Sequence, residues 1–392
     1  MEENVVPEQN SPNPTPPPFS GSTPPPVLPP PPLYPRQGIY PQRRSSNRLP
    51  WIIIGVIVVL FFGYNFLTGI THTLRLGGAK PLHVRENGLN EIILEENGPD
   101  KLLVIDVEGV ISSAPIERGG GSLVESIKEQ LKLAEDDTKV KGVILKVNSP
   151  GGEVLASDDI YNLIAAFQKK TKKPVVASMG TLAASGGYYV SAPCRWIVAN
   201  ELTITGSIGV IMHGYNYRGL MDKIGLKPEV YKSGKFKDML SGEKKPEEVT
   251  EEERKMVQDL INETYGRFTN IVAKGRSRES FDDKGSGKTA GTSLAKDWTD
   301  YADGRVMSGR QALDLGFVDE LGNFETAVKS ASNFAHVNGE PTLIQYQHPF
   351  NIGSLFKLFG KTEMEPIKVD LGLNTLKLQS GHMYFIAPIV LH

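Results

Sequence analysis

The sequence of 392 residues contains one cysteine, Cys194. A single cysteine excludes an internal disulfide bond and a zinc site built from several cysteines, although it says little about the compartment. The chain also lacks an excess of basic residues, because its formal net charge is -2 and charges of both signs are interspersed. A nucleic-acid-binding protein normally carries a basic stripe, so we exclude that class.

Prolines are unevenly distributed: 16 of the 28 lie within residues 1–50. Residues 1–49 also hold too few apolar side chains to form a core, so we expect a disordered tail with polyproline II runs. The tail could dock a proline-recognition domain or could be a solvated spacer, and the sequence leaves both open.

The next segment, residues 50–71, contains a run of 20 mostly apolar residues from position 51 to position 70. This length is what a helix needs to cross a bilayer, so we expect a single transmembrane helix. A cleaved signal peptide fits less well, because about 50 residues precede the run. Arg43, Arg44 and Arg48 stand before it, which favours a cytoplasmic N-terminus and a body outside the cytoplasm.

Residues 72–340 alternate between apolar runs and amphipathic patterns, which predicts an α/β fold with layered sheets. A surface loop is expected at about residues 277–297, and the pattern fades in an extension of residues 341–392. Strands are predicted at residues 102–111, 143–147, 174–179, 196–199 and 208–212. Helices are predicted at 122–133, where Ser122 and Glu125 suit a capping box, and at 158–167, 248–274, 309–315 and 323–334.

The loop contains Gly285-Ser286-Gly287-Lys288-Thr289, which resembles a phosphate-binding loop. That motif requires a further glycine where this chain has Asp282, and it requires a preceding strand. We therefore do not predict nucleotide binding there.

Two glycine-containing motifs each follow an apolar run and open a helical pattern: Ser149-Pro150-Gly151-Gly152 and Ala184-Ser185-Gly186-Gly187. A strand that leads through glycines into a helix N-terminus directs backbone N–H groups into one cleft, which suits a developing oxyanion. Ser185 is then a candidate nucleophile. A serine beside glycine is also common in turns and helix caps, so that explanation stays open.

A serine nucleophile needs a base, and the residues offer two candidates. His213 follows the predicted strand at residues 208–212. Lys237 lies between Phe236 and Asp238, in surroundings that could disfavour its charged form. Spacing alone does not decide between His213 and Lys237.

Five motifs in order closely resemble the signal peptide peptidase A family, membrane-anchored bacterial serine–lysine peptidases, in the short form with one catalytic module. The resemblance covers about residues 100–335. The motifs are Asn148-Ser149-Pro150-Gly151-Gly152, Ala183-Ala184-Ser185-Gly186-Gly187-Tyr188-Tyr189, Thr205-Gly206-Ser207-Ile208-Gly209-Val210, Lys232-Ser233-Gly234-Lys235-Phe236-Lys237-Asp238 and Ala302-Asp303-Gly304-Arg305-Val306 through Leu313.

The resemblance implies a ClpP/crotonase-like superhelical fold of repeated β-β-α units, preceded by the single transmembrane helix. It implies a Ser/Lys dyad in which Ser185 is the nucleophile and Lys237 the general base. The oxyanion hole would be formed by Gly151, Gly152 and Gly186. It implies neither a cofactor nor a metal.

The implied activity is endopeptidase cleavage of remnant signal peptides and other small hydrophobic peptides at the bacterial cell membrane, with the catalytic domain outside the cytoplasm. The implied assembly is a homo-oligomer in which a lysine of one subunit completes the site of its neighbour. Two alternatives remain: a ClpP-like peptidase that uses Ser185 and His213, and a non-catalytic membrane scaffold.

Residues 383–391 are apolar, and we hypothesise that they occupy a peptide-binding groove.

Overall fold

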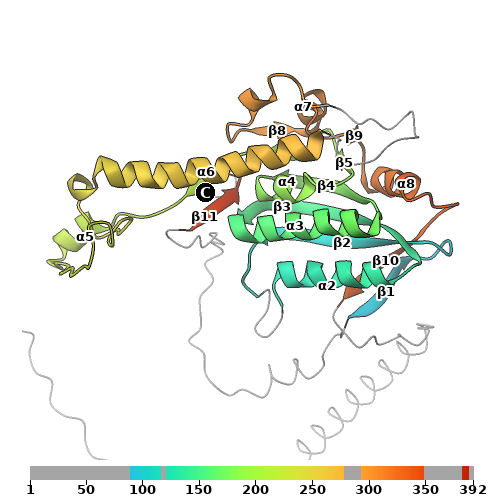
Figure 1. Cartoon of the computed structure of the whole chain (residues 1–392), viewed down its shortest axis with the longest axis horizontal. Coiled ribbons are helices and arrows are strands. Elements are labelled where there is room, and N and C mark those ends of the chain that lie inside the picture. Colours follow the sequence, from blue (N-terminus) through green and yellow to red (C-terminus); the bar gives the residue numbers. More distant parts are fainter. Residues whose placement is uncertain (1–88, 116–120, 278–292, 348–381, 388–392) are drawn as a thin grey trace, which may run out of the picture. The chain divides into compact units, whose positions relative to one another are not determined.

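The computed structural model describes residues 89–115, 121–277, 293–347 and 382–387 (Figure 1). The predicted tail of residues 1–49, the predicted transmembrane helix of residues 50–71 and most of the predicted loop of residues 277–297 lie outside these ranges. Among the helices in the described ranges, none combines the length and the apolar character that a bilayer crossing requires.

A mixed β-sheet forms the centre of the described part. Its main strands follow the order β1-β10-β2-β3-β4-β5-β9, in which β1 is antiparallel to β10 and the others run parallel. Short strands branch from this order: β6 pairs with β4, β8 with β6, and β11 with both β3 and β7. The strands are β1 (Asn90–Glu95), β2 (Lys101–Ile111), β3 (Val140–Glu153), β4 (Val175–Ala184), β5 (Trp196–Ala199), β6 (Ile204–Gly206), β7 (Ile211–Met212), β8 (Val306–Ser308), β9 (Glu320–Leu321), β10 (Thr342–Gln347) and β11 (Met383–Ile386).

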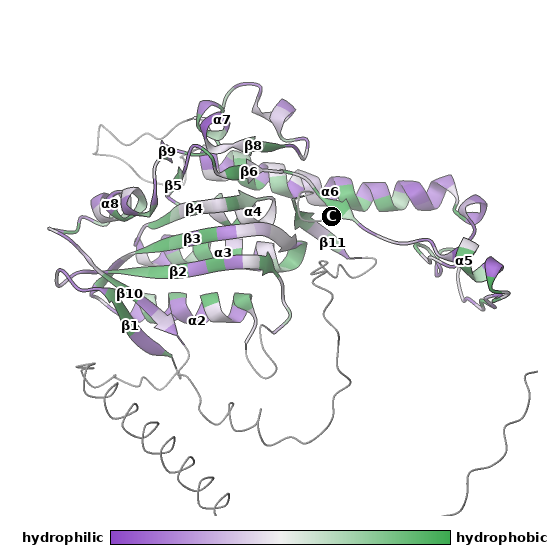
Figure 2. Cartoon of the chain, turned by 180° about the vertical axis from the view of Figure 1, so that it is seen from behind, coloured by the Kyte–Doolittle hydropathy of each residue, from purple (hydrophilic) through white to green (hydrophobic). Residues whose placement is uncertain are grey.

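Helices cover both faces of the sheet, because alternate strand residues point to opposite sides. Leu103, Val143 and Val175 belong to the larger core under α2, α3 and α4, whereas Ile144 and Val176 pack against α8. Figure 2 shows the hydrophobic strands between these layers. The helices are α2 (Leu123–Asp136), α3 (Val154–Thr171), α4 (Gly186–Ser191), α5 (Arg218–Lys223), α6 (Glu251–Arg276), α7 (Gly309–Asp314) and α8 (Phe324–Phe334), with 3₁₀ turns η1 (Pro246–Glu248) and η2 (Trp298–Tyr301).

Most predicted elements are present. The capping box at the start of α2 is confirmed, since the Ser122 side chain accepts from the Glu125 N–H and the Glu125 side chain accepts from the Ser122 N–H. The strand predicted at 208–212 is shorter than expected: β7 has two residues, and Ser207, with φ 50°, interrupts the extended backbone before it.

Six other strands were not predicted from the sequence: β1, β6, β8, β9, β10 and β11. Strand β10 lies inside the sheet, between β1 and β2, and its Leu343 pairs with Leu102. The alternation of apolar runs and amphipathic patterns fades after residue 340, but two later segments, β10 and β11, still pair with strands of the sheet.

Candidate active site

The two glycine-containing motifs lie side by side at the carboxyl ends of β3 and β4. The pairing of β3 with β4 shifts register after Val147, so that Ser149 lies opposite Ala183. The Pro150-Gly151-Gly152 segment of β3 therefore runs beside the turn from β4 into α4. The Gly151 N–H donates to the Ser149 hydroxyl at 3.0 Å. Ser185 is the residue between β4 and α4.

Ser185 has an unusual backbone conformation, with φ 55° and ψ -116°. Such a conformation costs on the order of 1–3 kcal/mol in a non-glycine residue and persists only where the surroundings impose it. Its N–H donates to the Gly206 carbonyl at 2.8 Å, and its carbonyl accepts from the Tyr189 N–H at 2.8 Å. The backbone on both sides of Ser185 is therefore fixed.

The Ser185 hydroxyl does not act as a helix cap. Its side chain makes no capping hydrogen bond to α4, the residue is 1% exposed, and its Oγ has no hydrogen-bond partner among the described residues. A serine kept for turn or cap chemistry would accept a backbone N–H. The geometry therefore counts against the cap explanation.

The three predicted oxyanion glycines lie against one another beside Ser185. A Cβ on Gly151, where φ is 99°, would stand 2.6 Å from the Gly186 nitrogen. A Cβ on Gly186 would stand 3.0 Å from the Gly152 nitrogen, and one on Gly152 would stand 1.9 Å from the Ile111 carbonyl oxygen. Only glycine fits at these positions, so the amide groups of two strand-to-helix units can approach closely.

The C-terminal strand β11 lies directly on this site. It pairs antiparallel with β3, placing Ile386 opposite Gly151 and Phe385 opposite Gly152, and it pairs antiparallel with β7 on its other side. The Ala387 N–H donates to the Pro150 carbonyl at 2.8 Å. Residues 383–387 of the apolar C-terminal segment thus lie between β3 and β7 at the glycine motif, and residues 388–391 lie outside the described ranges.

Neither candidate base hydrogen-bonds to the Ser185 hydroxyl within the described part of this single chain. Lys237 is exposed in a turn after α5, where its N–H donates to the Gly234 carbonyl at 3.2 Å. Lys232 and Lys235 in the same turn form ion pairs with Asp238 and Glu252. For the Lys237 ammonium, the described residues provide no ion pair.

His213 follows β7, and its ring packs edge-on against Tyr215 with the two ring centroids 4.8 Å apart. Because the Ser185 Oγ is unpartnered, His213 does not hydrogen-bond to it. The structure therefore brings together Ser185 and the three glycines, and neither candidate base hydrogen-bonds to the Ser185 hydroxyl.

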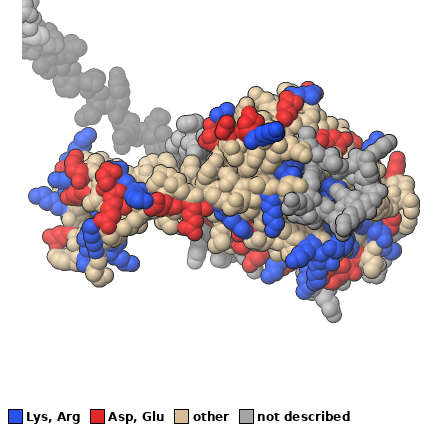
Figure 3. All heavy atoms as spheres, turned by 45° about the horizontal axis from the view of Figure 1, so that its top comes forward, with Lys and Arg blue, Asp and Glu red and all other residues tan. Residues whose placement is uncertain are grey.

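Lys237 belongs to a projection of residues 213–250, which we call the arm. The arm contains α5 and lies beyond the end of α6 that is remote from α4 (Figure 1). Acidic and basic side chains crowd its surface (Figure 3). Several large apolar side chains of the arm are also exposed: Leu220, Ile224, Leu226, Val230 and Tyr231.

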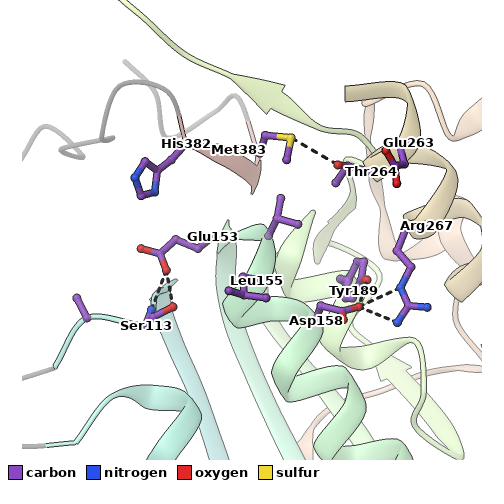
Figure 4. Close-up of a pocket in the computed structure, with 12 residues that line it drawn as sticks. Ser113, Glu153, Leu155, Asp158, Tyr189, Glu263, Thr264, Arg267, His382 and Met383 are labelled. Carbon is purple, nitrogen blue, oxygen red and sulfur yellow. Dashed lines mark hydrogen bonds and ion pairs between the residues drawn. The ribbon is translucent and has the colours of Figure 1, made fainter. Parts of the chain in front are cut away.

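A cavity of about 810 Å³ lies beside β11, between α3 and α6 (Figure 4). At its wall the Asp158 carboxylate accepts from the Tyr189 hydroxyl at 2.5 Å and from the Arg267 guanidinium at 3.0 Å. Burial is the larger of two effects that raise the pKa of Tyr189 well above its ordinary value, and the hydrogen bond to Asp158 is the second. Sequence analysis missed this network, because Asp158 and Arg267 are 109 positions apart and no local pattern links them.

On the other side of the cavity, the Glu153 carboxylate joins β3 to the end of β2. It accepts from the Ser113 N–H at 2.9 Å and from the Ser112 hydroxyl at 3.0 Å. Burial opposes ionisation of this carboxyl, but these hydrogen bonds outweigh it and hold its pKa below the ordinary value. Within the described ranges, no group of three or more His, Cys, Asp or Glu residues is arranged to hold a metal ion.

Comparisons with known proteins relate this chain to two peptidase families. Residues 167–338 match Peptidase family S49, and residues 115–197 match the Clp protease family. A protein of Enterococcus faecium assigned as signal peptide peptidase SppA is 36% identical over 319 residues, which cover 77% of this chain and 85% of that protein.

Two further relatives are similar over shorter lengths. A protein of Methanocaldococcus jannaschii assigned as a protease is 41% identical over 229 residues, covering 58% of this chain and 65% of that protein. Protease 4 of Haemophilus influenzae is 36% identical over 243 residues, covering 61% of this chain and 36% of that longer protein. We conclude that this chain belongs to the signal peptide peptidase A family and is a serine-type endopeptidase. The mixed β-sheet covered by helices agrees with this conclusion.

Proposed function

We propose that Ser185 is the nucleophile and that the N–H groups near Gly152 and Gly186 hold the oxyanion. The observation that carries this proposal is the strained, buried Ser185, whose Oγ has no partner and which lies against glycines that exclude any Cβ. Preorganised N–H donors of this kind stabilise a tetrahedral intermediate without reorganisation during the reaction.

In the proposed reaction the Ser185 Oγ attacks a peptide carbonyl carbon while a neutral amine removes its proton. The C–N bond then breaks, and the protonated amine returns the proton to the leaving nitrogen. Water, deprotonated by the same amine, hydrolyses the ester and restores the hydroxyl. Because the amine acts in its neutral form, activity should rise as the pH rises.

We propose that this amine is Lys237 of a second copy of the chain. Lys237 is exposed on the arm, and the Ser185 Oγ has no partner among the described residues of its own chain. The exposed apolar side chains of the arm are typical of a surface that another protein covers. The match to Clp protease also favours an oligomeric assembly.

For the substrate, we propose small hydrophobic peptides such as the remnants of signal peptides, cleaved next to a membrane. The apolar run of residues 51–70 would anchor the chain in the bacterial cell membrane, with the proline-rich tail in the cytoplasm and the catalytic domain outside it. The apolar strand β11, bound antiparallel at the glycine motif, illustrates the kind of peptide that fits.

A complementation experiment tests the nucleophile and the shared base together. Ser185→Ala and Lys237→Ala should each be inactive on an apolar peptide, and a mixture in which subunits exchange should recover activity, because one intact site can form between two variants. His213→Ala is the control and should stay active. Activity of Lys237→Ala with loss in His213→Ala would assign the base to His213 instead.

Labelling with a serine-reactive phosphonate tests the chemistry independently of any substrate. The wild-type chain should be modified at Ser185, and modification should be much slower in Lys237→Ala. Absence of labelling at Ser185 in the assembled protein would favour the non-catalytic scaffold.

A further inference from the structure

Lys244 lies where the arm joins α6, and its ammonium contacts two carboxylates. It donates to the Glu253 carboxylate of α6 at 2.7 Å, and it forms an ion pair with the Asp238 carboxylate of the arm at 3.7 Å. Asp238 directly follows Lys237 in the chain. One amine therefore connects α6 to the turn that carries the proposed base.

The backbone between Lys237 and Lys244 is folded into turns. The Ser241 N–H donates to the Asp238 carbonyl at 3.1 Å, and the Lys244 N–H donates to the Ser241 carbonyl at 3.4 Å. Lys232 adds a second cation to the Asp238 carboxylate at 2.8 Å. Because these contacts hold the turn together, the place of Lys237 depends on the place of Lys244.

The two segments at the base of the arm lie against each other. The Tyr217 N–H donates to the Gly242 carbonyl at 3.0 Å, and the Asn216 side-chain amide donates to the Lys244 carbonyl at 2.8 Å. A Cβ on Gly242 would stand 2.3 Å from the Tyr215 carbonyl oxygen, so only glycine allows this approach. Contacts of Lys244 with α6 therefore act on both segments of the arm.

Helix α6 is also attached to the body, on the side of the nucleophile. The Arg267 guanidinium donates at 3.0 Å to the Asp158 carboxylate oxygen that accepts from the Tyr189 hydroxyl of α4. Between Arg267 and Glu253 the helix spans about 21 Å, from a helical rise of about 1.5 Å per residue. Helix α6 thus contacts the helix that follows the nucleophile and, farther along, the base of the arm (Figure 1).

Two neighbouring glutamates of α6 each pair with a lysine of the arm, but their surroundings differ. The Lys244 and Glu253 side chains are 13% and 4% exposed, whereas those of Lys235 and Glu252 are 65% and 54% exposed. Exposed pairs contribute little, because water and salt screen them. Breaking a largely buried pair leaves a charge without its partner, so the Lys244–Glu253 pair is the stronger constraint on the arm.

We propose that Lys244 and Glu253 are positioning residues, whose ion pair fixes the direction of the arm so that Lys237 of one subunit reaches Ser185 of another. The proposal rests on the proposed function, because it requires a base from a second copy of the chain. Lys244 itself takes no part in proton transfer. Its hydrogen bond to Glu253 raises its pKa, so this amine stays charged, whereas the base must be neutral.

Mixed assemblies test in which subunit the pair acts. A Ser185→Ala chain supplies only the base and a Lys237→Ala chain only the nucleophile, so peptide cleavage reports sites formed between the two. Glu253→Gln in the base-supplying chain should lower kcat by about tenfold or more with little change in KM, because a displaced catalytic group reacts slowly. In the nucleophile-supplying chain it should lower kcat by less than about twofold. Equal losses in the two placements would indicate a general structural role and overturn the proposal.

The matched control is Glu252→Gln, at the adjacent position of α6. It removes the exposed pair with Lys235 and should leave kcat nearly unchanged in either chain. A loss as large as that of Glu253→Gln would mean that the charge at the start of α6, and not the buried pair, matters, and would contradict the proposal.

Lys244→Met tests the same pair from the arm, and it decides the question if thermal unfolding shows that Glu253→Gln is not folded. In the base-supplying chain it should lower kcat as Glu253→Gln does, and in the nucleophile-supplying chain it should have little effect. Both substitutions together in the base-supplying chain should cost little more than one, because they remove a single interaction. Fully additive losses would show that Lys244 and Glu253 act separately.

The same mixtures separate this proposal from the proposed function. If the Ser185→Ala and Lys237→Ala chains do not complement each other before any further change, the shared base is wrong and the positioning role is rejected with it. If they complement each other and Glu253→Gln acts equally in both chains, the positioning role alone is rejected.

Discussion

Arg276 and Asp319 form an ion pair that is entirely buried, with both side chains 0% exposed. Two guanidinium nitrogens of Arg276 reach the two carboxylate oxygens of Asp319 at 2.9 and 2.5 Å, and its Nε donates to the Gly316 carbonyl at 3.1 Å. Asp319 also accepts from the Ile197 N–H of β5 at 2.9 Å. The pair thereby fixes the end of α6 to the edge of the sheet, and α6 also supplies Phe268, whose ring packs against Tyr189 and Phe385.

Removing one partner of this ion pair should strongly destabilise the folded protein. Arg276→Ala should lower the free energy of unfolding by about 3–5 kcal/mol, because it leaves the Asp319 carboxylate buried without its cation. The matched control is Arg305→Ala, which breaks an exposed pair with Asp303 and should cost at most about 1 kcal/mol. Urea unfolding of both variants measures the difference. Equal losses of unfolding free energy in the two variants would mean that the surroundings of Asp319 compensate for the missing Arg276 guanidinium.

Gly151 should not tolerate a side chain. In Gly151→Ala the new methyl group would collide with the Phe385 carbonyl oxygen and the Gly186 nitrogen, at a φ of 99° that disfavours alanine. We expect kcat/KM to fall by about 100-fold or more, as when an oxyanion donor is removed in other serine hydrolases.

The control for this loss is Gly304→Ala, which has a φ of 92° but no atom within 4 Å of its new methyl group. It isolates backbone strain, which should reduce stability by about 1 kcal/mol and leave peptide cleavage nearly unchanged. If Gly151→Ala cleaves peptides as fast as Gly304→Ala does, Gly151 has no part in the oxyanion site.

The arm should lose order in acid. The hydrogen bond from Lys244, at 2.7 Å, and one from the Thr250 N–H lower the pKa of Glu253 below its ordinary value. The hydrogen bond from Lys232 similarly lowers the pKa of Asp238. A carboxyl whose pKa is lowered by folding contributes stability above its unfolded pKa of about 4, and that contribution disappears as the pH falls through the folded value.

Hydrogen exchange measured by mass spectrometry can follow this loss. Peptides from residues 213–250 should lose protection below about pH 4, while peptides from α3 keep theirs. In Lys244→Met the arm should already be less protected at neutral pH and should change less with acid. An arm with the same acid response in Lys244→Met as in the wild type would contradict this origin.

The sequence predicted the local parts of the fold best. The strand at 196–199 and the Ser122–Glu125 capping box depend on neighbours within a few residues, and both are present. Strand β10 was missed because its six residues carry three polar side chains, and its partner Leu102 lies far away in the sequence. Its place in the sheet depends on that distant pairing.

In the candidate site, too, the sequence predicted the parts that depend on local patterns and missed the parts that depend on distant contacts. Ser185 and the glycines are found in the sequence because each motif is a strand followed by a helix start, and parallel strands bring such ends together. The cluster of aromatic rings beside the site combines Tyr189, Phe268 and Phe385 from three distant segments, and no local motif links them. In the shared site that we propose, Lys237 of a second copy of the chain would approach Ser185, so no pattern within one chain fixes their distance.

Tyr189 has two separable features, its ring and its hydroxyl. Tyr189→Phe keeps the ring that stacks on Phe385 but removes the donor to Asp158, which keeps its bonds from Arg267. We expect the free energy of unfolding to fall by about 1.5–3 kcal/mol, as for loss of a hydrogen bond to a charged group. Tyr189→Leu should lower it further, because this change also removes the ring that packs against Phe268 and Phe385. Urea unfolding measures both variants, and equal losses would show that the hydroxyl and Asp158, and not the ring, account for the contribution of Tyr189 to stability.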